Sequence, residues 1–168
     1  MKTYFRYLVL FILYLFSNSI LAESLAQSAT NRGINETCAS YLGQIEEKYG
    51  LNGLNITFAH PENPSLFPSL HLSTQNYNNG ASNFSATLSP NQENCYLSTV
   101  ISTAINGQGC DEISLLKLKI EPELTSDSYS NDNFIILTPK DNSYQILLTS
   151  SGSSSCLMTE TRMMWPGN

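Results

Sequence analysis

The amino-acid sequence predicts a mainly β protein: a single disulfide-stapled antiparallel sheet or sandwich-like domain with a short N-terminal helix. Three observations support this class. Only 13% of the 168 residues are charged, and Ser, Thr and Asn are abundant, as on exposed faces of antiparallel sheets. Short stretches of alternating apolar residues are separated by Pro, Gly and Asn. The four cysteines form an even set, which is typical of disulfide-stapled exported domains.

Residues 1–22 have the features of a secretory signal peptide. Lys2 and Arg6 precede an apolar run over residues 7–16, and the small residue Ala22 follows a polar break. Because the run is shorter than the ~20 residues that span a membrane, we favour cleavage over an uncleaved anchor. We therefore expect a secreted or periplasmic protein with no stable membrane anchoring after cleavage.

Beyond the predicted cleavage point, the chain divides into two parts. Residues 23–36 are polar and without period, which predicts a flexible N-terminal lead-in. Residues 37–168 are predicted to form a single mainly β domain, because the roughly 146 residues left after cleavage suffice for one core but not for two. The sequence shows no internal repeat.

A helix is predicted at the start of the domain. Cys38, Leu42 and Ile45 recur at helical spacing. Thr37 is the expected N-cap, and Gly50 is the expected stop.

Strands are predicted to follow this helix. Alternating apolar residues indicate strands over residues 54–58, 70–72 and 84–88, with a Pro-rich loop over residues 60–69. Residues 95–105 fit both a strand and a helix, and their β-branched side chains favour the strand.

The last third of the chain gives the clearest strand pattern. Strands are predicted over residues 113–120, 134–138, 144–149 and 157–165. Residues 121–133, which are acidic and rich in Ser, are predicted to form a long loop.

Cys38, Cys95, Cys110 and Cys156 are predicted to form two disulfides. A strand from Cys95 would carry the chain about 33 Å away before the turn that holds Cys110, so these two are not expected to pair. In a simple meander, Cys156 would return to the end of the sheet where Cys95 lies. We therefore favour Cys38–Cys110 with Cys95–Cys156, and the alternative is Cys38–Cys95 with Cys110–Cys156.

The charge of the chain bears on its partners. The net charge is -6, and loss of Lys2 and Arg6 would make the chain more acidic still. An acidic surface repels phosphate backbones, so no nucleic-acid partner is expected. A basic protein is the partner that such a field favours, and the alternative is that the acidity only maintains solubility.

Catalytic and metal-binding motifs are sparse. His60, Glu62 and His71 supply three ligand types, but no spacing fixes them together. Ser114 and Lys117 form a Ser-x-x-Lys motif, yet in the predicted strand they would point to opposite faces, and the companion Lys-Thr-Gly is absent. We therefore expect no catalytic residue, metal or cofactor.

Exposed aromatic residues and an acidic loop are the candidate binding features. Aromatic side chains in loops and at chain ends are typical of binding surfaces. The acidic residues would attract a cation or a basic partner, with a simple solvated loop as the alternative. The candidates are Phe67, Tyr77, Trp165, Glu121, Glu123, Asp127 and Asp132.

Export, acidity and the lack of a catalytic motif lead to one expectation of function. We expect an exported non-catalytic binding protein, specifically an acidic inhibitor or immunity-type protein acting on a cationic partner such as a cell-wall hydrolase. Two alternatives stay open: a small secreted hydrolase using carboxylates with His60 or His71, and a surface or adhesion module.

Overall fold

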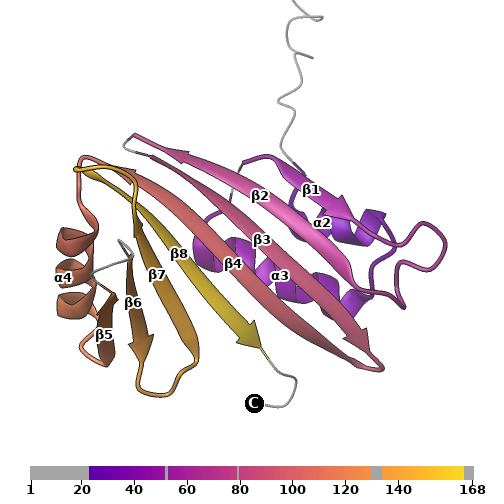
Figure 1. Ribbon diagram of the computed structural model, residues 1–168. Helices are drawn as coiled ribbons and strands as arrows, with labels where there is room; N and C mark the ends of the chain where they lie inside the picture. The colour runs from indigo at the N-terminus through magenta and orange to yellow at the C-terminus, as the bar shows by residue number, and fades with distance from the viewer. Residues whose placement is uncertain (1–22, 52, 79, 130–133, 165–168) are drawn as a thin grey trace, which may run out of the picture.

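The computed structural model contains one continuous eight-stranded antiparallel sheet, which confirms the mainly β class (Figure 1). It describes residues 23–51, 53–78, 80–129 and 134–164, so the predicted signal peptide lies outside the described residues. The strands are β1 (Asn55–Phe58), β2 (Ser69–Tyr77), β3 (Gly80–Asn91), β4 (Asn94–Asn106), β5 (Leu124–Tyr129), β6 (Phe134–Pro139), β7 (Tyr144–Ser150) and β8 (Ser155–Met164), and the helices are α2 (Leu25–Asn31), α3 (Glu36–Tyr49) and α4 (Cys110–Ile120).

The topology repeats although the sequence shows no repeat. Helix α3 precedes strands β1–β4, and helix α4 precedes strands β5–β8. We call these the first unit, which also includes α2, and the second unit. The strand order is β1-β2-β3-β4-β8-β7-β6-β5, so the last strands of the two units pair antiparallel in the middle of the sheet. Apart from α2, each unit is therefore one helix followed by a four-stranded meander.

The disulfides follow this repeat. Cys38 bonds to Cys95 and Cys110 bonds to Cys156, with Cα–Cα distances of 5.3 and 5.0 Å. Each bridge joins the first turn of a helix to the second residue of the last strand of the same unit. The favoured sequence-based pairing is wrong, because β8 lies antiparallel to β4 and Cys156 faces Ile105, at the far end from Cys95.

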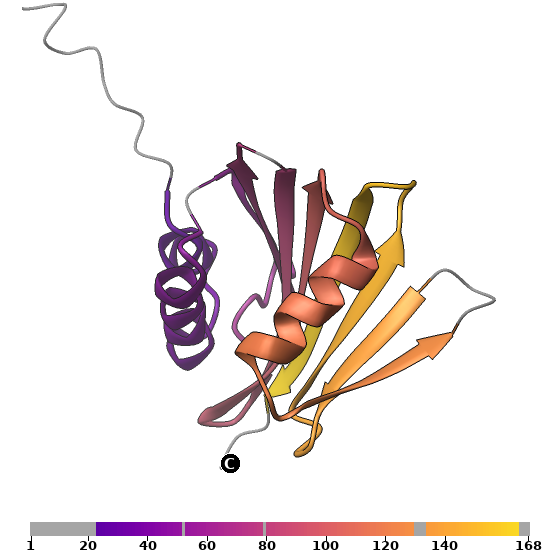
Figure 2. The same ribbon diagram turned by 90° about the vertical axis from the view of Figure 1, so that its left-hand side faces the viewer.

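The helices pack on one face of the sheet, over two hydrophobic clusters (Figure 2). In the first unit, Leu42 on α3 packs with Phe84 and Leu97, all at most 1% exposed. In the second unit, Ile113 on α4 packs with Leu148. Both clusters lie on the same face of the sheet. Cys156 of the second cluster lies opposite Ile105 on β4, and Ile105 is on the same face of β4 as Cys95 of the first cluster.

The N-terminal lead-in prediction is wrong. Residues 25–31 form α2, and both Leu25 and Ala29 have 0% exposure, spaced one helical turn apart in the first cluster. Ser24 caps the helix, because its Oγ accepts a hydrogen bond from the Gln27 backbone N–H at 3.0 Å. The segment is ordered by burial of these small apolar residues.

Helix α3 is close to its predicted bounds. The N-cap is Asn35 and not Thr37, since Asn35 Oδ1 accepts from the Thr37 backbone N–H at 2.9 Å. Gly50 ends the helix with φ 61°, a left-handed conformation that suits glycine.

Two predictions in the second unit are wrong, and the other strands are confirmed. Residues 110–120 form α4 where a strand over residues 113–120 was predicted. Strand β5 runs through the first part of the predicted acidic loop, whose residues 130–133 lie outside the described residues. Strand β4 confirms the strand interpretation of residues 95–105.

Among the helices of the described residues, none has the length and apolar character needed to cross a membrane.

Candidate functional site

The face of the sheet opposite the helices is uncovered in the described structure, and we call it the open face. Strand alternation places every second residue there, so Leu147 is 38% exposed while its neighbours Ile146 and Leu148 are 0% exposed. Among the residues whose exposure the structure describes, eight large apolar side chains on this face are between 36% and 55% exposed: Ile56, Phe58, Leu70, Tyr96, Val100, Leu147, Leu157 and Met163.

Hydroxyl groups fill the open face between these apolar residues. Ser102 on β4 lies opposite Thr159 on β8, and their side-chain oxygens are 3.2 Å apart in a hydrogen bond. Thr161 and Val100 form the next open-face pair along the two strands. Hydroxyls that bond to each other across strands present a surface that is easily dehydrated.

The open face has almost no charge. Within the described strands, the register places no Lys or Arg on it, and Asp127 on β5 is its one acidic residue. Depletion of charge together with exposed apolar and aromatic residues is the composition of the buried centre of a protein interface. Ordinary solvated sheet faces carry more charge than this.

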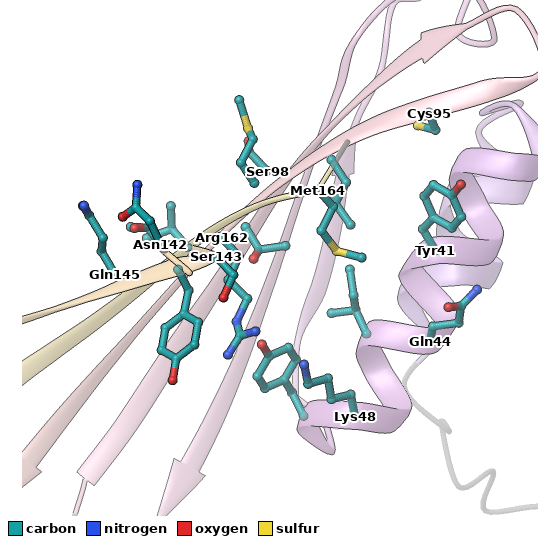
Figure 3. Close-up of a pocket in the computed structure, with 18 of the residues that line it drawn as sticks. Tyr41, Gln44, Lys48, Cys95, Ser98, Asn142, Ser143, Gln145, Arg162 and Met164 are labelled. Carbon is teal, nitrogen blue, oxygen red and sulfur yellow. The ribbon is translucent and has the colours of Figure 1, made fainter. Parts of the chain in front are cut away.

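A second feature is a groove on the helix side of the sheet, with a volume of about 1000 Å³. One wall is α3, where Tyr41, Gln44 and Lys48 lie on one side of the helix at spacings of three and four residues. The hairpin between β6 and β7 forms the other wall, and the ends of β4 and β8 form the floor (Figure 3).

Arg162 on the floor of the groove belongs to a polar network. Its Nε donates to Glu160 Oε1 at 2.6 Å, and its guanidinium lies 4.2 Å from the centre of the Tyr144 ring. Burial alone would lower the pKa of Arg162, but the hydrogen bond and charge of Glu160 outweigh it and raise the pKa. The hydroxyl of Tyr49 also donates to Glu160 Oε1, at 3.3 Å, and burial and then the Glu160 charge raise the pKa of Tyr49.

Glu121, a predicted binding residue, takes part in the hydrogen bonds that hold the end of α4. It is the C-cap of α4, and its carboxylate accepts hydrogen bonds from Tyr144 and from Lys117, the latter at 3.0 Å. The Tyr144 hydrogen bond is the main reason why the pKa of Glu121 is lowered. Burial, followed by Glu121, raises the pKa of Tyr144 to about 12.

The other predicted binding residues do not meet at one place. Phe67 stacks on His60 with ring centroids 4.5 Å apart, while Tyr77 lies at the far end of β2, roughly 27 Å along a strand of this length. Asp127 lies at the edge of the open face, and Glu123 lies between α4 and β5. Asp132 and Trp165 lie outside the described residues.

Neither histidine has the surroundings of a catalytic or metal site. His71 has 0% exposure, and its ring nitrogens bond to Thr57 and Ser69 at 3.1 and 2.9 Å, so no substrate can reach it. His60 accepts backbone hydrogen bonds from its own loop. Over the described ranges, no three His, Cys, Asp or Glu side chains are placed to hold a metal ion.

The Ser-x-x-Lys motif lies on a helix, so the strand argument against it is wrong. Ser114 and Lys117 are one turn apart on α4. Ser114 is nevertheless only 5% exposed, and Lys117 is paired with Glu121. The serine is therefore closed to substrate and the lysine is engaged elsewhere.

Sequence reasoning missed the open face. The available signal was the presence of apolar residues at both alternating positions of a strand, as in Ile146-Leu147-Leu148. A strand with one solvated face needs apolar residues at every second position only, so the extra ones indicate a second apolar face.

No protein-family model matches the chain, and no curated protein or solved structure matches it either.

Proposed function

We propose that this protein is exported and binds a basic protein through its open face, as an inhibitor or immunity-type protein. A cell-wall hydrolase is the partner class that we favour. The observation that carries the proposal is the open face itself, where the described strands place eight exposed large apolar residues and no basic residue. Export is supported by the predicted signal peptide and by the two disulfides.

Charge supports a basic partner at two stages of binding. The net charge of -6 attracts a cationic protein from a distance and speeds encounter. At contact, the open face requires few charged groups to be dehydrated, so its apolar side chains supply affinity. The mechanism is steric: the sheet face, once docked, covers the cleft of the partner.

The test is inhibition of basic cell-wall hydrolases, with lysozyme as the first probe, by the mature protein. Two single-lysine variants provide the contrast. Val100→Lys puts a charge at the centre of the open face, whereas Ser40→Lys puts the same charge on an exposed position of α3. We expect Val100→Lys to raise the Kd at least about tenfold, because a like charge is buried against a basic partner, and Ser40→Lys to change it by less than about twofold.

Two outcomes would overturn the proposal. One is that no basic hydrolase of the panel is bound or inhibited. The other is that both lysine variants weaken binding equally, which would mean that net charge and not the open face carries recognition.

A further inference from the structure

The groove on the helix side arises from how the two helices are placed. Helix α3 contacts β3 and β4, and α4 contacts β5 to β8. Between α3 and the β6–β7 hairpin, the ends of β4 and β8 have no helix over them, and the groove of about 1000 Å³ lies there. This volume is at the upper end of the roughly 300–1,000 Å³ of small-molecule sites. The walls of the groove, α3 and the β6–β7 hairpin, lie on the helix side, whereas Val100, Thr161 and Met163 of the open face contribute to its floor. The wall residues are not part of the surface proposed to bind protein, so the ligand of the groove is a separate question.

The charges in and beside the groove balance. Arg162 is paired with Glu160, and of the remaining lining residues Lys48 is basic and Asp141 is acidic. A site for an anion would show an excess of positive charge. The groove therefore favours a neutral ligand.

The uncharged lining combines aromatic surface with side-chain amides and hydroxyls. Tyr41, Tyr49 and Tyr144 supply rings, and Gln44, Asn142 and Ser143 supply hydrogen-bond donors and acceptors. In Figure 3, Gln44 projects from α3 on one side of the groove, while Asn142 and Ser143 lie on the other side. Tyrosine rings offer an apolar face with a polar tip, and side-chain amides pair well with other amides. The complementary ligand has apolar ring faces, hydroxyl groups and amide groups.

We propose that the groove binds a neutral oligosaccharide with N-acetyl groups. A sugar ring stacks on Tyr41, since Arg162 lies over the Tyr144 ring and Lys48 Nζ lies 5.3 Å from the centre of the Tyr49 ring. The acetamido groups exchange hydrogen bonds with Gln44 on α3 and Asn142 on the hairpin. The volume of about 1000 Å³ suits several linked rings better than one.

The probe is tri-N-acetylchitotriose, with maltotriose as the matched sugar that lacks acetamido groups. Titration calorimetry gives the Kd, and amide chemical shifts of the labelled protein locate the site. We expect binding of the N-acetylated sugar only, with the largest shifts in α3 and the β6–β7 hairpin.

Variants that preserve the fold connect this binding to the groove. Gln44→Ala removes an exposed amide from α3, and Gln27→Ala makes the same change on α2, outside the groove. Asn142→Gly suits the positive φ of 54° at this position. We expect Gln44→Ala and Asn142→Gly each to raise the Kd by about fivefold, as for loss of one hydrogen bond, and Gln27→Ala to leave it unchanged.

Three results would overturn the proposal. These are no binding of tri-N-acetylchitotriose at millimolar concentration, equal affinity for maltotriose, and a Kd that neither groove variant changes. Each can occur whether or not a hydrolase binds the open face, so the two proposals fail independently.

Discussion

The first and second units share one plan but differ in size and in helix coverage. Strands β2, β3 and β4 have 9, 12 and 13 residues, whereas β6, β7 and β8 have 6, 7 and 10. The longer first unit carries α2 beside α3, and α2 also packs on β1. The shorter second unit is covered by α4. The comparison indicates that helix coverage follows the area of sheet that must be kept from water.

The cores of the two units also differ in chemistry. The first contains a buried polar chain in which Ser28 donates to Thr57 at 3.1 Å and His71 bonds to both Thr57 and Ser69. In the second, the cluster residues are aliphatic apart from the disulfide. One topology therefore tolerates two kinds of interior.

The largest expected effect tests whether the two disulfides are equivalent. The bridges span 57 and 46 residues, so loop-closure entropy assigns each about 4 kcal/mol of the free energy of unfolding. We expect Cys38→Ala/Cys95→Ala and Cys110→Ala/Cys156→Ala to lose similar stability in urea unfolding. A much larger loss in one double variant would show that one unit depends on its bridge more than chain entropy explains.

The next effect tests which face of the second unit is its core. Leu148→Ala removes a fully buried side chain and should lower the free energy of unfolding by about 3 kcal/mol. Leu147→Ala, on the open face of the same strand, should lower it by less than about 1 kcal/mol. Urea midpoints at constant slope measure both, and equal losses would contradict the assignment of the open face.

The buried histidine predicts a pH dependence that belongs to the first unit. Burial lowers the pKa of His71 from 6.5 to about 4. The unfolded chain therefore takes up the proton first as pH falls, and stability decreases from about pH 6.5 down to about pH 4. Between pH 7 and pH 5, the loss should be about 2 kcal/mol.

A variant without the imidazole isolates this dependence. His71→Gln keeps a polar side chain but cannot titrate, so its free energy of unfolding should vary less between pH 7 and pH 5 than that of the wild type. The same pH dependence in both proteins would assign the effect to carboxylates and not to His71.

The smallest expected loss of stability comes from removing either of the two hydrogen bonds that hold the helix ends. Tyr144 donates to Glu121 at the end of α4, and Tyr49, the last residue of α3, donates to Glu160. We expect Tyr144→Phe and Tyr49→Phe each to lower the free energy of unfolding by about 1 kcal/mol. Thermal unfolding of both variants measures this, and no change in either would mean that water replaces the lost partner.

Most strands were predictable from the sequence, and helix α4 of the second unit was not. Strands β6 and β7 are short apolar runs bounded by turn residues, so their positions were confirmed. Helix α4 has exposed apolar residues, with Leu115 at 70% and Ile120 at 65%, and these blur its helical period. The acidic residues of its first turn and the lysines of its last turn were the helix signals.

Edge elements and surfaces were harder to predict for a related reason. Strand β5 lies at the sheet edge, and in its described part Leu124 is the buried residue, so it gives little apolar alternation. The candidate site residues were chosen from loops, whereas the open face is formed by strands that lie far apart in sequence. Its uncharged character depends on the register between β4 and β8, which no local pattern reveals.

Both disulfides close within their own unit, and this has a consequence for proteolysis. A cut in the link between β4 and α4 would leave two fragments with no covalent bond between them, joined mainly along the ten residue pairs of the β4–β8 seam. Such a nicked protein should separate in denaturant without any reductant. The same seam offers a place to divide the gene, so that two independently oxidised fragments reassemble only when both are present.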